Sequence, residues 1–469
     1  MATLLDLMAK IRPVPKAGKL NADRLVILRM GLGRDSMTML LLLAQHELVV
    51  NGKRRGPDEV DAVVFTDPGH EWSFTYDLIP RVEAFCKKYK IRFLWQKKPP
   101  AEGLGGWVAW KLHQVNERVA AKRQGRGASF GKPPWQRDPP DSIEARCASG
   151  YYHDRIPLFE DYGSKDAWIS KEDSTCTINH KIDPGRKLAV DLQIERFGFM
   201  DVRGSARKAA HTQQGGAWSD AVERGEREPH LVLIGYAADE EKRVKSIKEK
   251  KADWSKHFDT EAYPLMDMGI TKKGEEAYLA SLPGVDPRGR FVDGGFADVK
   301  KSGCRSCIHQ DRLQWWMLRT LDPKYFKQIE DHEARVVKRT GPWQAIFPES
   351  YVAVNRRVVR GAAPHVTPEL ARARRAGFLA VFARKVPNPE GNNPEFVWAR
   401  VPDAEFDLDE DLEADDHDRC TVFIWKPLMT QVEERLAQYV AQHGRQPNVE
   451  EVAAKEYRGC PMEKIGGLR

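Results

Sequence analysis

The sequence predicts an α/β protein built on a doubly wound parallel sheet. Short apolar runs occur at residues 24–30, 60–65, 91–95 and 231–235, and they predict β-strands that are buried on both faces of a sheet. Segments with helical character follow the first two runs, at residues 37–50 and 72–89. Strands that alternate with helices at this spacing indicate βαβ units, and their crossovers are almost always right-handed.

The rest of the chain is less regular but divides into two parts. Before residue 340, we expect helices at residues 107–124, 187–197, 239–254, 312–321 and 323–338. Thr271 is a plausible N-cap and predicts that another helix begins after it. Residues 203–227 are rich in Gly, Arg and Lys and are predicted to form a basic loop. Beyond residue 340, β-like runs at residues 350–359 and 378–386 precede a helix at 427–443. We therefore expect a nucleotide-binding domain over residues 1–340 and a mixed α+β extension over residues 341–469, to which the sequence assigns no role.

Composition limits the function classes. Charged residues make up 30% and apolar residues 41% of the chain, which is ordinary for a globular protein. The net charge of +7 is compatible with an anionic substrate or nucleic acid without establishing either. No apolar run reaches the roughly 20 residues that span a bilayer, and the N-terminus lacks a secretory pattern. We expect a cytoplasmic protein without a membrane partner, whose seven cysteines are thiols or ligands rather than a disulfide framework.

The segment between the first strand and its helix has the composition of a phosphate-binding loop. Glycines allow close backbone approach, and a helix N-terminus favours an anion. Residues 31–36 (GLGRDS) lack the Gly-Lys-Ser/Thr of a Walker loop, and Ser36 stands where a dinucleotide fingerprint has its third glycine. The segment resembles the PP-loop, whose pattern is S-G-G-x-D-S. It agrees with this pattern at three positions and departs from it at two. The variable position holds a cation. The matches are Gly33, Asp35 and Ser36, the departures are Gly31 and Leu32, and the variable position holds Arg34.

Further blocks resemble the PP-loop ATP pyrophosphatase and phosphoadenylyl-sulfate (PAPS) reductase-like superfamily. They cover about residues 22–338 in the expected order, while residues beyond 340 match nothing. Ala237 stands where many relatives have an arginine. The residues that carry the likeness are Phe65, Thr66, Asp67, Gly69, Glu71, Thr75 and Tyr76; Thr175, Cys176, Thr177, His180, Lys181, Ile182 and Pro184; Gly235, Asp239, Glu240 and Arg243; Tyr263, Pro264, Leu265, Gly269, Ile270 and Thr271; and Ser302, Gly303, Cys304, Cys307, Trp315 and Pro323.

The resemblance implies a site and an activity. The phosphates of ATP, or of PAPS, would rest on residues 31–36, with Gly235 beside them and adenine next to Phe65 and Thr66. Asp67 or Glu71 would bind Mg²⁺ or a ribose hydroxyl. The expected catalytic residues are Asp35, Ser36, Lys181 and Arg243.

The implied reaction cleaves ATP between the α- and β-phosphates. A substrate oxygen is adenylated, and sulfur or an amine then displaces AMP, with positioning and charge neutralisation supplying most of the catalysis. In this branch the acceptor could be DNA or RNA, served by a sulfur donor protein.

Four cysteines are candidate metal ligands. Cys304 and Cys307 have a spacing that lets both thiolates reach one centre. With Cys176 and Cys147 they could hold a 4Fe–4S cluster or, less favoured by the resemblance, Zn²⁺. The alternative is that Cys147 and Cys176 are small buried residues and that the pair caps a helix. Cys86 and Cys420 are expected in the core.

Two other functions stay open. A PAPS or sulfonucleotide reductase needs a nucleophilic thiol, for which Cys460 in a basic tail is the candidate, although the tail motif of that family is absent. Cys460→Ser would abolish turnover in such a reductase and would be silent in an adenylating enzyme that releases pyrophosphate. The third function is a nucleotide sensor or nucleic-acid-binding protein whose altered PP-loop no longer supports chemistry.

Overall fold

The computed structural model describes most of the chain and divides it into two compact units. The first comprises residues 1–161, 171–309 and 454–469, and the second residues 162–170 and 310–453. The structure describes residues 19–99, 104–127, 132–155, 157–163, 175–202, 213–241, 244–245, 257–281, 284–285, 291–292, 296, 299, 303–307, 310–341, 349–354, 379–387, 396–401 and 420–454.

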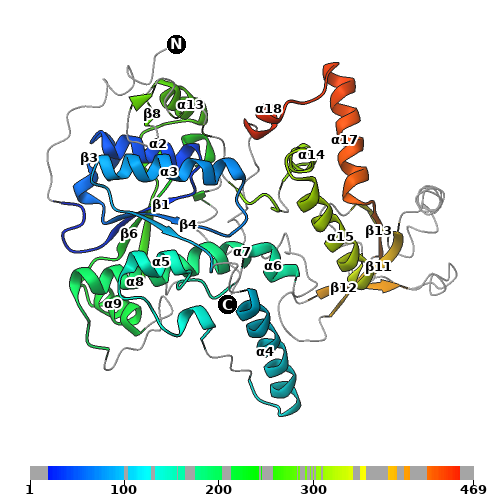
Figure 1. The fold of residues 1–469 in the computed structure, drawn as a ribbon, viewed down its shortest axis with the longest axis horizontal. Helices are drawn as coiled ribbons and strands as arrows, with labels where there is room; N and C mark the ends of the chain where they lie inside the picture. The colour runs from blue at the N-terminus through cyan, green and yellow to red at the C-terminus, as the bar shows by residue number, and fades with distance from the viewer. Residues whose placement is uncertain are drawn as a thin grey trace. The chain divides into compact units, whose positions relative to one another are not determined.

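The first unit contains a five-stranded, all-parallel sheet (Figure 1). Its strands lie in the order β5 (Phe93–Gln96), β4 (Ala62–Thr66), β1 (Val26–Met30), β6 (His230–Ile234) and β7 (Asp259–Ala262). The chain thus adds strands outward on one side of β1 and then crosses to the other side. This is the doubly wound order, with its topological switch point between β1 and β6. Four of the strands were predicted; β7 was not.

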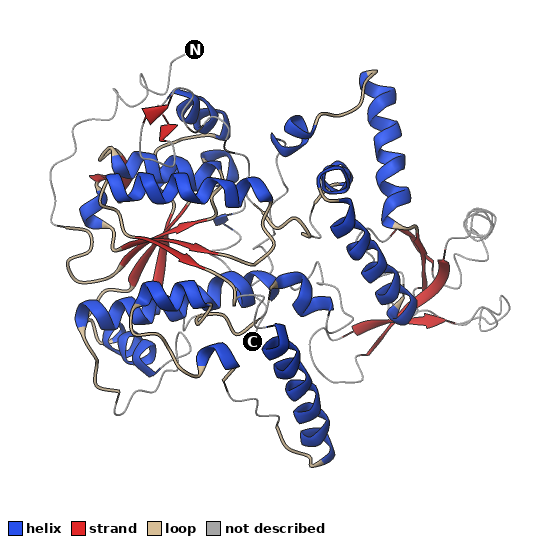
Figure 2. Cartoon of the chain, viewed as in Figure 1, coloured by secondary structure: helices blue, strands red, loops and turns tan. Residues whose placement is uncertain are grey.

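Helices cover both faces of this sheet (Figure 2). One face carries α2 (Arg34–Ala44), α3 (Ser73–Lys88) and α13 (Lys272–Ser281), and the other carries α5 (Ile143–Ser149), α8 (Asp183–Phe197) and α9 (Gln213–Glu223). These positions confirm the predicted helices at residues 72–89 and 187–197. The helix predicted at residues 107–124 is α4 (Leu104–Arg123).

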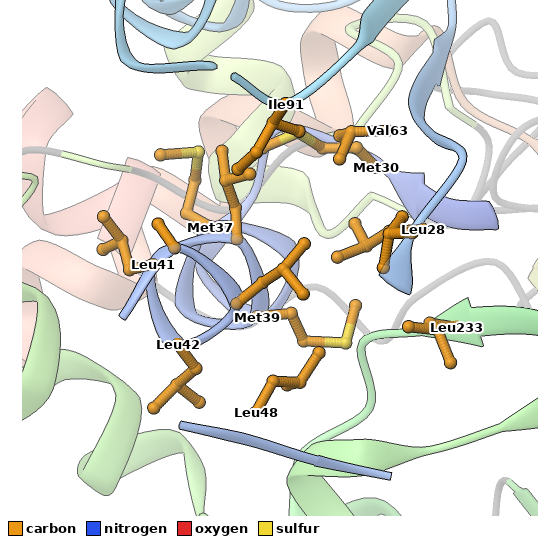
Figure 3. Close-up of a cluster of buried hydrophobic side chains, with 14 of the residues drawn as sticks. Leu28, Met30, Met37, Met39, Leu41, Leu42, Leu48, Val63, Ile91 and Leu233 are labelled. Carbon is orange, nitrogen blue, oxygen red and sulfur yellow. The ribbon is translucent and has the colours of Figure 1, made fainter. Parts of the chain in front are cut away.

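The side chains of β1 alternate between two apolar cores, as the pleat of a strand requires. Val26, Leu28 and Met30 pack with the apolar residues of α2 (Figure 3). Leu25 and Ile27 pack into the opposite core with residues of α5, α8 and α9. Since β1 is buried on both faces, its register fixes where the loop after Met30 leaves the sheet.

Three predictions along the first unit need correction or fall outside the described residues. The helix predicted over residues 37–50 ends at Ala44, because His46 takes a left-handed φ of 59°, and β2 (Leu48–Val50) then pairs with β3 (Lys53–Arg55). Residues 213–223 of the predicted basic loop form α9, while residues 203–212 are outside the described part. Of the predicted helix at 239–254, only the beginning is described, starting with the short 3₁₀ turn η6 (Ala238–Glu240).

The second unit is α+β. Its sheet is antiparallel in the order β10 (Glu349–Val354), β13 (Cys420–Trp425), β11 (Leu379–Pro387) and β12 (Phe396–Val401). The predicted helices are confirmed as α14 (Arg312–Leu321), α15 (Pro323–Thr340) and α17 (Leu428–His443). Arg312 donates to Gln431 and so joins α14 to α17. The long segment of this unit begins at Gln310, whereas the sequence placed the boundary near residue 340. No helix of the described residues is long and apolar enough to span a membrane.

Candidate functional site

A cavity of about 350 Å³ opens at the carboxyl ends of β1 and β6, the switch point of the sheet. This is where open α/β sheets bind ligands, and the volume is in the range of small-molecule sites. Most residues that the sequence predicted for the nucleotide lie around this one cavity, although they come from four separate segments. Its lining includes Arg29, Gly31, Gly33, Arg34, Asp35, Ser36, Phe65, Thr66, Lys181, Arg186, Gly235, Asp259 and Glu261.

The loop after β1 presents a helix N-terminus to the cavity. Gly33 is the N-cap of α2, and no side chain caps the first turn. The hydroxyl of Ser36 donates to the Gly33 carbonyl at 3.0 Å, which holds the turn closed. Backbone N–H groups at such an end favour a phosphate. Leu32 takes a left-handed φ of 58° and is buried, so it shapes the loop without lining the cavity.

Gly235, directly after β6, lets the loop approach the neighbouring strand. A Cβ at this position would lie 2.9 Å from the Cβ of Asp35, 3.0 Å from its carbonyl carbon and 3.1 Å from the amide nitrogen of Ser36. Two of these three atoms are backbone, so no rotamer change would relieve the overlap. Glycine is therefore required for the end of β6 to pack against the first turn of α2.

Two arginines that the sequence did not predict form part of the cavity wall. Arg29, on β1, donates to the carbonyl of Lys181 at 3.3 Å, and burial lowers its pKa to about 10. Arg186, on α8, donates to Asp259 at 3.3 Å. Asp259 and Glu261 come from the unpredicted strand β7. The sequence could have pointed to Arg29 as a site residue, because a charged side chain within an apolar central strand needs a polar environment.

Phe65 and Thr66 lie at the carboxyl end of β4, as predicted. The hydroxyl of Thr66 donates to the Gln96 side-chain carbonyl at 2.5 Å. The Gln96 amide donates in turn to the Pro184 carbonyl at 2.9 Å. This chain of hydrogen bonds connects β4 and β5 to the start of α8, and it fixes one wall of the cavity.

Asp67 and Glu71 are not among the residues that line the cavity, and their expected role in binding Mg²⁺ or a ribose hydroxyl stays a prediction. Asp67 accepts hydrogen bonds from the Gly69 amide at 2.6 Å and the Tyr76 hydroxyl at 2.9 Å, so its carboxylate holds the loop. Glu71 is buried and accepts from Lys181 Nζ at 3.2 Å. Burial raises the pKa of Glu71, an effect that Lys181 opposes. Glu71 therefore reaches the cavity only through Lys181, and Arg243 lies outside the described residues.

The structure does not bring the four candidate cysteine ligands together. Among the described residues, no group of three or more His, Cys, Asp or Glu side chains is placed to hold a metal. Cys147 packs in the apolar core formed with α5, α8 and α9, where burial raises its pKa to about 12. Cys304 pairs by a β-bridge with Glu71 and Cys307 follows in the same turn. The described residues thus do not fit a four-cysteine cluster.

The other four cysteines lie in separate parts of the chain. Cys176 is half-buried in α7 (Thr175–Thr177). Cys86 belongs to the core, as predicted, and burial raises its pKa to about 12. Cys420 begins β13, and Cys460 is outside the described residues.

A buried polar cluster adjoins the cavity and was missed from the sequence. Lys98 Nζ lies 3.0 Å from Nδ1 of His153, 2.9 Å from Nδ1 of His180 and 3.3 Å from the Arg155 carbonyl. Burial lowers the pKa of Lys98 to about 7, and it lowers that of His153 as well. His180 and Lys181 are neighbours in a π-helical turn, η4 (Ile178–Ile182), a geometry that often marks functional sites.

Comparison with known proteins gives no match to a protein-family model, a curated protein or a solved structure. The function must therefore be argued from the chemistry of the site, because a fold alone does not determine it.

Proposed function

We propose that the chain binds an adenine nucleotide in this cavity and cleaves ATP at the α-phosphate. One observation carries the proposal: residues 31, 33–36, 65, 66, 181 and 235, which were singled out from the sequence, line a single cavity at the switch point. A chance likeness of short sequence blocks would not be expected to converge in this way.

The loop supplies the phosphate site. The uncapped N-terminus of α2 offers backbone N–H donors and a favourable dipole. Lys181 and Arg34 also line the cavity and add positive charge to it. Both side chains are already ion-paired, Lys181 with Glu71 and Arg34 with Glu276. Their partners hold them in place, so less entropy is lost when a triphosphate binds.

Adenine fits best at the carboxyl end of β4. Phe65 and Thr66 are positioned there by the sheet and by the Gln96 hydrogen bond, and they line the cavity together with Met30 of β1. This arrangement places the base and the triphosphate on neighbouring strands, β4 and β1.

The reaction proposed for this geometry is adenylation. A substrate oxygen attacks the α-phosphorus, the bond from that phosphorus to the bridging oxygen of the β-phosphate breaks, and pyrophosphate leaves with the bond electrons. Helix N–H groups and the cations Lys181 and Arg34 stabilise the charge that develops on the phosphate oxygens. A sulfur or amine nucleophile then displaces AMP, and DNA or RNA is the proposed acceptor class.

Equilibrium binding of radiolabelled ATP to the full chain tests the first step, with GTP as the competitor that should fail. Pyrophosphate release on addition of DNA or RNA, with a sulfide source, tests the second. Failure of ATP to bind at millimolar concentration would overturn the proposal. Binding without product on any acceptor would instead favour a nucleotide sensor with an altered loop.

A further inference from the structure

Exposed apolar side chains of the described residues concentrate on α4 (Figure 1). Five large apolar side chains are exposed among these residues, and three of them, Leu112, Val115 and Val119, lie on this one helix. Their exposed fractions are 59%, 51% and 46%. The spacing of three and then four residues places them in one stripe along the helix. Single exposed apolar side chains are ordinary, whereas neighbouring ones mark interaction surfaces.

The stripe lies opposite the face by which α4 packs against its own chain. Trp110 and Ala121 are buried, and α4 contacts the 3₁₀ turn η3 (Pro134–Gln136). At about 100° per residue, these two buried side chains point roughly 160° away from the centre of the stripe. α4 thus has one apolar face that its own chain covers and a second that is about half exposed. An apolar helix face is expected to be covered by another element, so the second face fits a partner.

Cations border the stripe on both sides. On the same helical projection, Lys122 lies at one edge of the stripe and Arg123 at the other, and both are exposed. Residues 104–127 include five basic residues and one acidic residue, a net charge of +4. The acidic residue, Glu117, is ion-paired with Arg126 at 2.6 Å. This surface therefore favours a partner with negative charges beside its own apolar side chains.

We propose that the stripe of α4 docks a partner protein through an amphipathic helix whose apolar seam is bordered by Asp and Glu. The spacing of the stripe is that of the anchors in paired helices, where charges beside the seam select the partner. A second α4 is disfavoured because the cations at both edges would repel their copies. Sequence-independent nucleic-acid binding uses phosphate contacts and aromatic stacking, and residues 112–123 contain no Phe, Tyr or Trp. The proposal does not depend on a nucleotide in the cavity.

The probe for the test is a fluorescent synthetic peptide of three heptads, with Leu at both seam positions and Glu at both flanking positions. Repulsion between the glutamates keeps the peptide from pairing with itself. Binding to the full chain is read as fluorescence anisotropy. One control peptide has the same composition in scrambled order, and the other has Lys in place of Glu. We expect the chain to bind the Glu-flanked peptide about tenfold or more tightly than either control.

Two double variants locate the binding. Leu112→Gln with Val119→Gln removes the stripe and keeps good helix formers, so it should weaken binding of the Glu-flanked peptide by about tenfold or more. Leu321→Gln, at a position on α14 that is 48% exposed, should match the wild type. Lys122→Glu with Arg123→Glu should reverse the preference in favour of the Lys-flanked peptide. This charge reversal keeps the test valid if the glutamine variant folds poorly, which circular dichroism would reveal.

Equal binding of the Glu-flanked and scrambled peptides, or wild-type binding by both double variants, would overturn the docking surface. The same proteins are tested with a mixed-sequence oligonucleotide, with vesicles of anionic phospholipid, and for self-association by sedimentation. Any of these interactions that the wild type shows and that Leu112→Gln with Val119→Gln loses would assign the stripe to that occupant and overturn the proposal.

Discussion

Gly235→Ala is the sharpest test of the proposed site, because it adds one methyl group where the end of β6 meets the loop of residues 31–36. The new Cβ would stand 2.9–3.1 Å from atoms of Asp35 and Ser36, whereas carbon atoms in contact prefer about 3.5–4.0 Å. The loop or the strand end must therefore move by roughly half an ångström or more. Overpacking of this kind typically costs about 1–3 kcal/mol.

Part of that cost would fall on nucleotide binding, since the atoms that move are the amides proposed to hold the phosphates. A loss of about 1.4 kcal/mol is a tenfold weaker Kd, so if about half of the cost falls on binding we expect ATP affinity to drop by up to roughly tenfold. The assay is calorimetric titration with ATP, accompanied by denaturant unfolding of the same variant. Gly127→Ala is the matched control, because no atom lies within 4 Å of the Cβ it would add.

The result that would refute the reasoning is specific. If Gly235→Ala binds ATP as tightly as Gly127→Ala and the wild type, the loop at residues 31–36 does not hold the phosphates. If both alanine variants lose affinity equally, the effect is not local to the loop. In the first case, a lower unfolding free energy of Gly235→Ala would add that the methyl group disturbs packing without disturbing a nucleotide site.

Three other changes have defined outcomes. Lys181→Met should weaken ATP binding more than adenosine binding, by about tenfold, because hydrogen bonds to charged groups contribute about 1.5–3 kcal/mol; equal losses for both ligands would remove Lys181 from the phosphate site. Lys98, with its pKa lowered to about 7, binds fewer protons folded than unfolded above pH 7, so its contribution to stability rises with pH. The unfolding free energy of the wild type minus that of Lys98→Met should thus grow by about 2 kcal/mol from pH 7 to 9, and a flat difference would contradict the lowered pKa. Cys147→Val should keep metal content and change stability by less than about 1.5 kcal/mol, whereas loss of bound iron or zinc on anaerobic purification would restore Cys147 as a ligand.

The sequence predicted the central strands well because burial on both faces leaves a plain pattern. β1, β4, β5 and β6 each lie within two residues of an apolar run. β7 was missed because its sequence, DTEA, carries two carboxylates on an edge strand that faces the cavity. Packing in the folded protein, rather than its own sequence pattern, makes this segment a strand, as is common for polar β-strands. The end of α2 was also missed, since a single left-handed residue, His46, stops a helix that apolar periodicity would continue.

The site was predictable where its chemistry is local in sequence. The loop of residues 31–36 and the ends of β4 and β6 could be placed because each follows a recognisable strand. Lys98 could not be, because what makes it unusual is a neighbour far along the chain, His180. Desolvation of a buried charge arises only once the chain has folded, and a sequence pattern carries no record of it.

Leu32 bears on whether the altered loop can still work. Leu32 stands where the PP-loop pattern that the sequence resembles has a glycine, and it takes a left-handed backbone conformation with φ 58°, which costs a residue other than glycine roughly 1–2 kcal/mol. The side chain is 1% exposed in the same core as Val26 and Met37, and full burial of a leucine contributes about 1.5–3 kcal/mol. The two terms are of similar size, so the loop can keep the glycine-like conformation without the glycine. Departure from the pattern at this position is therefore compatible with a functional phosphate loop, and the backbone amides, rather than the residue identities, are what the binding measurements would probe.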